Sequence, residues 1–331
     1  MSFAREAQLA LVASASRAPS PHNTQPARWR FSGDRVELHE CVDRRLAVGD
    51  PTGRDHAIAL GSAWAGMAIA LSERGFQLGA MQPLSGGEGP VRGVGFAIVG
   101  SGAEPDPLAF AVRMRRAYRG MFTQADAAAR SRLDELVLRW PSIAWVDGAD
   151  ARAQIGREYD AAAAAGLHDP AFVRELYTWM RFSPRHRDWS RDGLAADCLA
   201  LSPLEAWGGR LALRPGVVRV LAALGLAGLL VSEAAKVRSA TALALLLAPR
   251  TEDPFATGRT FYRFWLDIAA CGFSAVPMSA LADSPDHSRR LVAAHAGGRD
   301  VALINVFRIG PTPQPPPAES ARLPDAELLL A

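Results

Sequence analysis

A repeated glycine spacing is the feature that most constrains the fold of this sequence. In each half, a glycine within a segment of helical composition precedes a Gly-Phe pair by fourteen residues: Gly61 before Gly75-Phe76, and Gly258 before Gly272-Phe273. A short apolar strand that ends in glycine follows both times, at residues 95–100 and 305–310. Because the order of elements recurs together with the spacing, we predict an internal duplication.

The duplication divides the chain into a first half, residues 1–105, and a second half, residues 106–331. Residues 155–250 have no counterpart in the first half, so we interpret them as a helical insertion that could act as a lid. We expect an α+β fold, in which two degenerate repeats form a pseudo-dimer with a mixed or antiparallel sheet flanked by long helices.

Local patterns place the individual elements. Apolar residues at helical spacing predict helices over residues 4–18, which Pro19 ends, and over residues 55–74, which Gly75 ends. We also expect a hairpin of residues 29–31 and 35–40 that turns at Ser32-Gly33-Asp34, and a strand at 93–99. Within residues 108–140 we expect an Arg-rich helix and then a second helix that begins near Gln124. Further helical runs are predicted at 170–181 and 217–248, and an extended Pro-rich tail is predicted at 311–317.

Composition excludes several classes of protein. With 331 residues and 49% hydrophobic residues, the chain can bury a sizeable core. A charged fraction of 21% and a net charge of +3 argue against nucleic acid as a partner. The three cysteines lie far apart without zinc or disulfide spacing, which fits a reducing cytoplasm, and no secretory signal is recognised at the N-terminus.

Residues 217–231 form a strongly apolar segment. It is shorter than the roughly 20 residues that a membrane span needs, and it contains Arg219. We therefore expect a buried helix and no membrane partner, with a membrane-associated helix as the alternative.

The loop of residues 18–26 is the first candidate site. Its hydroxyl and amide side chains are held between three prolines, so they offer rigid hydrogen-bonding groups to a planar ring or a sugar alcohol. The alternative is that these turn residues only bond to their own backbone.

Arg115 and Arg119 form the second candidate site. Four residues apart, they would share one face of a helix, where their like charges repel unless an anion such as a phosphate bridges them. The alternative is a solvated basic face or ion pairs with carboxylates elsewhere. The sequence has no GxGxxG after a strand, Walker loop, GxSxG or HExxH, and we expect neither a metal site nor a catalytic triad.

Three segments resemble motifs of the nitroreductase family. Ala-Pro-Ser-Pro-His-Asn-Thr-Gln-Pro at residues 18–26 resembles the flavin-contacting loop, and Arg-Arg-Ala-Tyr-Arg at 115–119 resembles the phosphate motif. Val-Pro-Met-Ser at 276–279 resembles the segment whose backbone approaches the flavin N5. The loop precedes the Arg motif, an order that is similar to the Acg-type twin-domain branch, in which two half-sites are fused in one chain.

The resemblance implies one FMN per chain, held by residues of both halves. The implied cofactor-binding residues are Ser20, Pro21, His22, Asn23 and Gln25 of the first half, and Arg115, Arg119, Pro277, Met278, Ser279 and Arg322 of the second. Ala27 stands where the family usually has Trp, and Ala117 stands where a Ser or Thr would touch the phosphate. These departures imply a reduced affinity.

The implied function is that of an FMN-dependent oxidoreductase. Hydride passes through the flavin N5 to or from a small organic substrate, with NAD(P)H as a candidate donor, and the flavin supplies the chemistry without a catalytic side chain. The alternative is an FMN-binding or sequestering protein whose flavin is covered by the insertion, and a third hypothesis is a flavin-free scaffold. The resemblance leaves open a monomer with pseudo-dimer architecture or a homodimer.

Overall fold

Two sheets of equivalent strand order form the main part of the computed structural model, which describes residues 2–87, 89–313 and 318–331. The first sheet has the order β1 (Ala27–Ser32), β2 (Arg35–Cys41), β5 (Val91–Ser101), β3 (Phe76–Leu78), and β4 (Gln82–Pro83) also pairs with β5. The second has the order β6 (Ala144–Val146), β9 (Ala242–Pro249), β11 (Val301–Gly310), β10 (Ser274–Pro277). All pairs in both sheets are antiparallel, which confirms the predicted α+β class.

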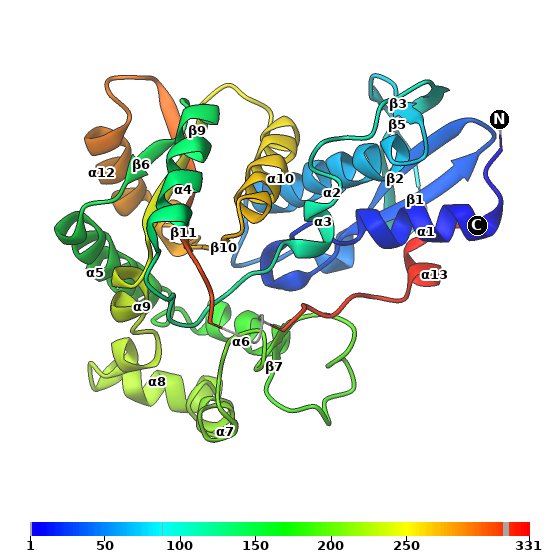
Figure 1. Cartoon of the computed structure of the whole chain (residues 1–331). Helices are drawn as coiled ribbons and strands as arrows, with labels where there is room; N and C mark the ends of the chain where they lie inside the picture. The colour runs from blue at the N-terminus through cyan, green and yellow to red at the C-terminus, as the bar shows by residue number, and fades with distance from the viewer. Residues whose placement is uncertain (1, 88, 314–317) are drawn as a thin grey trace.

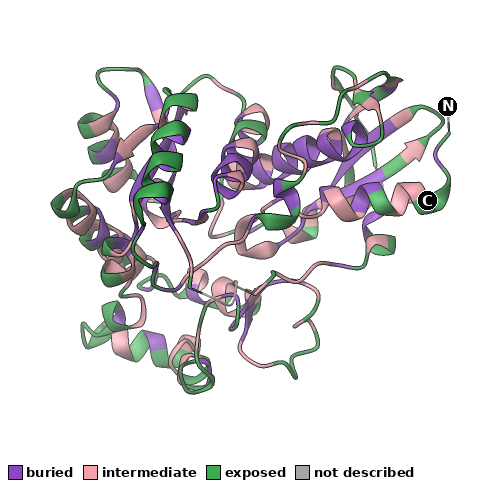
Figure 2. Cartoon of the chain, in the orientation of Figure 1, coloured by how far each residue is buried: buried purple, intermediate pink, exposed green. Residues whose placement is uncertain are grey.

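The two sheets are also equivalent along the chain. In chain order, each sheet begins with two strands that pair with each other, followed by a long helix and then an edge strand. The last strand lies between this edge strand and the first pair. The helices are α2 (Arg54–Ser72) in the first half and α10 (Pro254–Ala270) in the second. They lie against each other between the two sheets (Figure 1), and both are largely buried (Figure 2).

The repeated glycines make the contact between α2 and α10. A Cβ atom at Gly61 would overlap the carbonyl oxygen of Phe255, and a Cβ atom at Gly258 would overlap that of Ile58. Each glycine thus meets the residue three positions before the other, as a twofold relation between the repeats requires. Ser62 adds a buried hydrogen bond from its hydroxyl to the Gly258 carbonyl at 2.9 Å.

We predict that Gly61→Ala lowers the free energy of unfolding by about 3 kcal/mol, because the methyl group forces two closely packed backbones apart. Chemical denaturation followed by circular dichroism measures the change. Gly208→Ala is the matched control, since its position within a helix is open and alanine favours the helix by roughly 1 kcal/mol. An equal effect of the two substitutions would contradict the assigned contact.

The shorter helices surround this centre. They are α1 (Arg5–Ala15), α3 (Ala111–Met114), α4 (Ala127–Arg139), α11 (Ala280–Asp283), α12 (Pro285–His295) and α13 (Asp325–Leu328). The last residues return to the first half, where the backbone N–H of Leu330 donates to the carbonyl of Trp29 at 2.7 Å. Residues 318–331, which we call the tail, therefore end against the first half (Figure 1).

The insertion lies between β6 and β9. It comprises α5 (Ala149–Gly166), α6 (Pro170–Trp179), the short parallel pair β7 (Met180–Arg181) and β8 (Leu194–Ala195), α7 (Pro203–Ala212), α8 (Pro215–Ala223), the 3-10 turn η3 (Ala227–Leu230) and α9 (Ala234–Arg238). The prediction that it extends to residue 250 was wrong. Residues 242–249 form β9, a buried strand, and a continuous apolar run in a strand cannot be distinguished from one in a buried helix by periodicity.

Residues 217–231 are likewise not one buried helix. Gly225, with a φ of 72°, interrupts the segment between α8 and η3, and Leu224 and Leu229 on either side are 65% and 76% exposed. Among the described residues, no helix is long and apolar enough to cross a membrane.

Other boundaries differ by a few residues from the predictions. The Arg-rich helix shrinks to α3, and α4 begins at Ala127 rather than Gln124 because the Asp126 carboxylate accepts a hydrogen bond from the N–H of Ala129 at 2.7 Å. The hairpin and the α2 helix are confirmed. Of the tail predicted to be extended, residues 311–313 belong to no helix or strand, and residues 314–317 lie outside the described residues.

Candidate functional site

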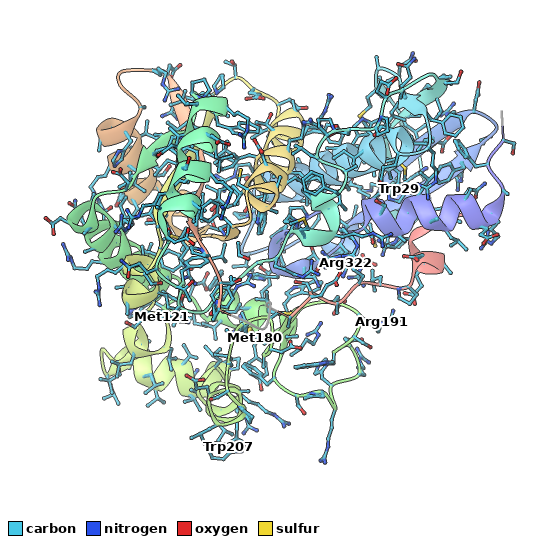
Figure 3. The ribbon with its side chains drawn as sticks, in the orientation of Figure 1. Trp29, Met121, Met180, Arg191, Trp207 and Arg322 are labelled. Atoms are coloured by element: carbon cyan, nitrogen blue, oxygen red, sulfur yellow. The ribbon has the colours of Figure 1, made fainter. Side chains whose placement is uncertain are left out.

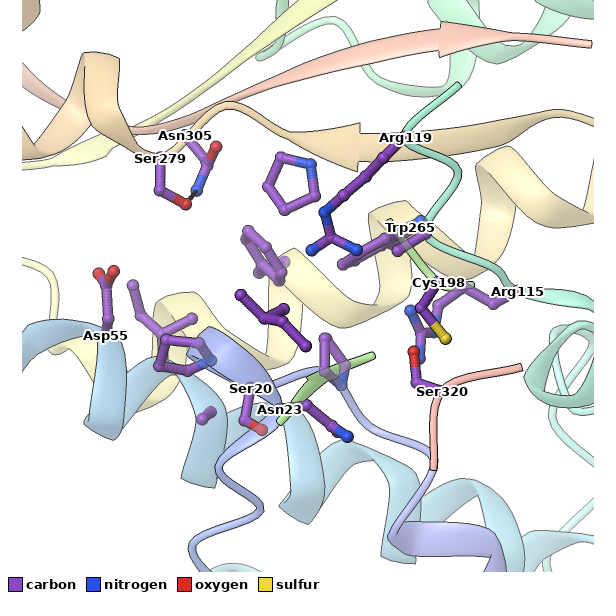
Figure 4. Close-up of a pocket in the computed structure, with 18 of the residues that line it drawn as sticks. Ser20, Asn23, Asp55, Arg115, Arg119, Cys198, Trp265, Ser279, Asn305 and Ser320 are labelled. Carbon is purple, nitrogen blue, oxygen red and sulfur yellow. Dashed lines mark hydrogen bonds between the residues drawn. The ribbon is translucent and has the colours of Figure 1, made fainter. Parts of the chain in front are cut away.

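A cavity of about 810 Å³, including the part open to solvent, lies where the two halves, the insertion and the tail meet (Figure 4). The α2–α10 contact lines one side of it through Ile58, Ala59, Phe261 and Trp265. Eight of the predicted residues line it: Ser20, Pro21, Asn23, Arg115, Arg119, Pro277, Ser279 and Arg322. Segments nearly 300 residues apart in the sequence therefore share one site.

The loop before β1 is held in a strained conformation. His22, Asn23 and Gln25 have φ values of 47°, 57° and 52°, a region that costs non-glycine residues on the order of 1–3 kcal/mol each. The Ser20 hydroxyl oxygen accepts a hydrogen bond from the backbone N–H of Gln25 at 2.9 Å. This geometry presents Ser20, Pro21 and Asn23 to the cavity.

Gln25, a predicted site residue, does not line the cavity and instead secures the loop. Its amide nitrogen donates to the carbonyl of Arg191 in the insertion at 2.9 Å, and its amide oxygen accepts from the N–H of Leu323 in the tail at 2.8 Å. One buried side chain thus joins the loop, the insertion and the tail.

His22, another predicted site residue, is likewise not among the residues that line the cavity. Burial, and secondarily the positive charge of Arg119, lowers the pKa of His22 to about 4. Its Nδ1 is buried without a hydrogen-bonding partner among the described residues. The imidazole is therefore neutral at physiological pH.

We predict that this histidine makes the protein less stable in mild acid. The folded state excludes a proton that the unfolded chain binds below about pH 6.5, so stability falls as the pH drops from 6.5 towards 4, by up to about 2 kcal/mol at pH 5. His22→Asn, which tolerates the positive φ, removes this part of the slope. Urea unfolding at pH 5 and pH 7.5 measures it, and an unchanged slope would contradict the buried neutral state.

The Arg115–Arg119 segment is extended, so the prediction that it forms a helical face was wrong. Ala117 forms a parallel bridge with Ala275 beside β10. In an extended chain alternate residues share a face, and Arg115, Ala117 and Arg119 accordingly all line the cavity. The two guanidinium groups therefore still share one wall, as the helix prediction required. They do so because alternate residues of an extended chain share a face, not because residues four apart share a helix face.

The arginines at this wall lack carboxylate partners. Arg115 donates to the Arg17 carbonyl at 2.7 Å, and Arg322 donates to the side-chain oxygen of Asn23 at 2.9 Å. Within the described chain, neither of them nor Arg119 forms an ion pair, whereas Glu319 pairs with Arg17 and Arg116. The Nε atoms of Arg115 and Arg322 are buried without a partner.

Burial of these cations has an electrostatic cost. Desolvation lowers the pKa of Arg322 to about 10, and it lowers the pKa of Arg115 and of Arg119 as well. The Arg115 guanidinium lies 4.5 Å from the centre of the Trp265 ring, which offsets part of this cost. A cluster of one buried and two half-buried cations with mostly neutral partners is suited to an anion.

The opposite wall comes from the second sheet. The Asn305 amide of β11 donates to the Ser279 hydroxyl at 3.1 Å, and both side chains line the cavity beside Pro277. Met278, predicted as a site residue, points into the core with 1% exposure, and its backbone N–H donates to the Val306 carbonyl at 2.7 Å. Only its backbone position is therefore close to the site.

The insertion covers part of the cavity with Gly193, Leu194 and Cys198. A buried ion pair of 2.6 Å between Arg181 and Asp192 fixes this segment, and Arg44 of the first half also contacts Asp192, at 3.1 Å. Burial raises the pKa of the Cys198 thiol to about 11, so the thiol is neutral at physiological pH.

Sequence reasoning missed Asp55, Cys198 and Asn305 as residues of the site. Asp55 begins α2 and pairs with Arg54, and desolvation raises the pKa of its carboxyl group. None of the three belongs to a local motif. Only the tertiary contacts of their helix, loop and strand reveal them.

No protein-family model matches the chain. Two relatives match over 63 residues at 43% identity: "Putative NAD(P)H nitroreductase MT3217" and "Putative NAD(P)H nitroreductase Rv3131", from two strains of Mycobacterium tuberculosis. The match covers 19% of this chain and 18% of each relative.

Solved structures overlap with a larger part of the chain at lower identity. The FMN-dependent nitroreductase NfnB of Mycobacterium smegmatis, in complex with NADPH, is 21% identical and has a TM-score of 0.33, with 62% of this chain and 89% of that chain covered. Iodotyrosine deiodinase bound to FMN and 3-iodo-L-tyrosine is 13% identical with a TM-score of 0.36, covering 65% and 95%.

Proposed function

We propose that this chain is an FMN-dependent oxidoreductase of the nitroreductase type. The observation that carries the proposal is the group of buried and half-buried arginines, without carboxylate partners in the described part of the chain, at one wall of a cavity whose α2–α10 side is apolar and aromatic. A flavin mononucleotide has the complementary chemistry, a dianionic phosphate joined through a hydroxylated chain to a planar ring. The motif resemblance and the names of the two relatives support the same assignment.

The residues of the cavity fit such a ligand. Arg115 and Arg322 would hold the phosphate, since each has a buried Nε without a partner. Ser20 and Asn23 would offer hydroxyl and amide groups to the sugar alcohol or the ring edge, while Ile58 and Phe261 supply apolar surface. Ala117 lies between the two arginines of the extended segment and supplies no hydroxyl, which removes one phosphate contact.

The proposal assigns the site to both halves, residues 1–105 and 106–331, as two fused half-sites. The loop of Ser20 and Asn23 comes from the first half, and Arg115, Arg119 and Ser279 come from the second. The equivalent strand orders of the two sheets support this organisation.

FMN, when bound, would supply hydride transfer for a small organic substrate. The task of this chain is then to bind, orient and exclude water. The Cys198 thiol is neutral and the α2–α10 side is apolar, so neither places a competing anion beside the arginines. No side chain needs to act as a nucleophile.

A second candidate function is FMN binding without turnover by NAD(P)H. The observation that favours it is the coverage of the cavity by Gly193, Leu194 and Cys198, on a segment fixed by the buried Arg181–Asp192 pair. If this segment stays in place, a nicotinamide has less room beside the flavin.

We predict that the purified chain binds FMN and that Arg115→Gln raises the Kd for FMN by about ten- to a hundredfold. A hydrogen bond to a charged group contributes roughly 1.5–3 kcal/mol, and 1.4 kcal/mol is tenfold in affinity. Fluorescence quenching titrations measure the Kd. Riboflavin, which lacks the phosphate, should lose little affinity in the same variant.

Arg113→Gln is the matched control for Arg115→Gln, because Arg113 is exposed and does not line the cavity. It should leave FMN affinity unchanged. A colourless protein that ignores added FMN would support a flavin-free scaffold and refute the proposal.

We also predict that anaerobic NADPH or NADH bleaches the absorbance of bound FMN near its visible maximum within minutes. Stopped-flow absorbance of the FMN-loaded protein measures the reduction. A persistent spectrum with both donors, together with full reduction by dithionite, would favour the covered-flavin alternative.

A further inference from the structure

The insertion carries an apolar surface that faces away from the rest of the molecule. In α7, Leu204, Trp207 and Leu211 recur at positions i, i+3 and i+7, so they form one stripe along the helix. They are exposed, and Trp207 lies at the outer edge of the insertion (Figure 3). An amphipathic helix of a globular protein normally turns such a stripe towards the core.

The next elements repeat this arrangement. In α8, Val217 and Val220 are exposed at the same spacing, which Leu224 continues at the end of the helix, while Val218 on the other side packs inward against Leu167 and Val173. Leu226 and Leu229, around η3, are exposed as well. We call the exposed apolar residues of 204–229 the insertion surface.

Apart from Glu205, the charged residues within 204–229 are all arginines. From Ala206 to Ser232 the sequence has no Asp or Glu, whereas Arg210, Arg214 and Arg219 are all exposed. None of the three forms an ion pair within the described chain. Glu205, just before this run, is engaged in the capping box of α7, where its carboxylate accepts the N–H of Ser202 at 2.7 Å.

We propose that the insertion surface docks on an anionic lipid bilayer. Leucine, valine and tryptophan side chains enter the boundary between headgroups and acyl chains, while exposed arginines contact the phosphates. A second copy of the chain fits less well, because a symmetric contact would bring the three arginines of each copy together, with Glu205 as the one carboxylate within residues 204–229. The proposal is independent of the flavin, since no residue of the insertion surface lines the cavity.

Co-sedimentation of the full-length chain with vesicles tests the proposal. We expect binding to phosphatidylcholine vesicles that contain 30% phosphatidylglycerol, at least about tenfold weaker binding to pure phosphatidylcholine, and weakening by salt. Equal binding to both vesicles, or binding to neither, would overturn the proposal.

Two variants locate the contact. Leu204→Ser/Trp207→Ser/Leu229→Ser should lower vesicle affinity at least about tenfold, and so should Arg210→Gln/Arg214→Gln/Arg219→Gln, which removes charge without touching the apolar residues. Leu138→Ser is the control, because Leu138 is 80% exposed on α4, outside the insertion. Circular dichroism and thermal unfolding confirm folding of each variant.

Light scattering in the absence of lipid tests whether a second copy of the chain occupies the insertion surface instead. A dimer that the Leu204→Ser/Trp207→Ser/Leu229→Ser variant converts to a monomer would overturn the proposal in favour of a second copy. A chain that stays monomeric and binds only the anionic vesicles supports it.

Discussion

The close packing of α2 against α10 is the contact on which the rest of the structure depends. Two helices can approach with their backbones almost touching only where side chains are absent, and Gly61 and Gly258 provide those positions. The contact sets the distance between the two sheets. It also forms one wall of the cavity, so the separation of the halves and the shape of the site have a common origin.

The second constraint is the burial of positive charge. Guanidinium groups lose hydration when they leave water, and Arg115 and Arg322 recover little of it from carbonyl and amide oxygens. The strained loop at His22, Asn23 and Gln25 adds a further cost at the same place. Strain and desolvation that coincide at one cavity are expected where function requires a particular arrangement. An anionic ligand would offset the electrostatic part of this cost.

The insertion connects the interior of the molecule to its surface. Its inner segment covers the cavity and is secured by Asp192 and by the Gln25 side chain, whereas α7 and α8 turn apolar stripes outward. A ligand in the cavity and a partner at the insertion surface would therefore contact the same insertion.

The sequence by itself predicted an internal repeat, the α+β class, which the structure confirms, and the motifs of the candidate site. Glycine spacing, turn chemistry and local periodicity are properties of neighbouring residues, so they can be read without coordinates, as at Gly61 and Gly258 or at the hairpin turn. Tertiary structure decided what depends on distant partners. It made residues 242–249 a central strand, and it made 115–119 an extended wall because Ala117 pairs beside β10.

The same distinction applies to individual site residues. Ser20 and Arg115 belong to recognisable local patterns, and both line the cavity. Gln25 and Met278 belong to the same patterns, yet one secures the loop and the other packs in the core. Asp55 and Asn305 have no local signal at all. A local pattern specifies which side chains are available, whereas only the contacts between distant segments decide which of them reach the cavity.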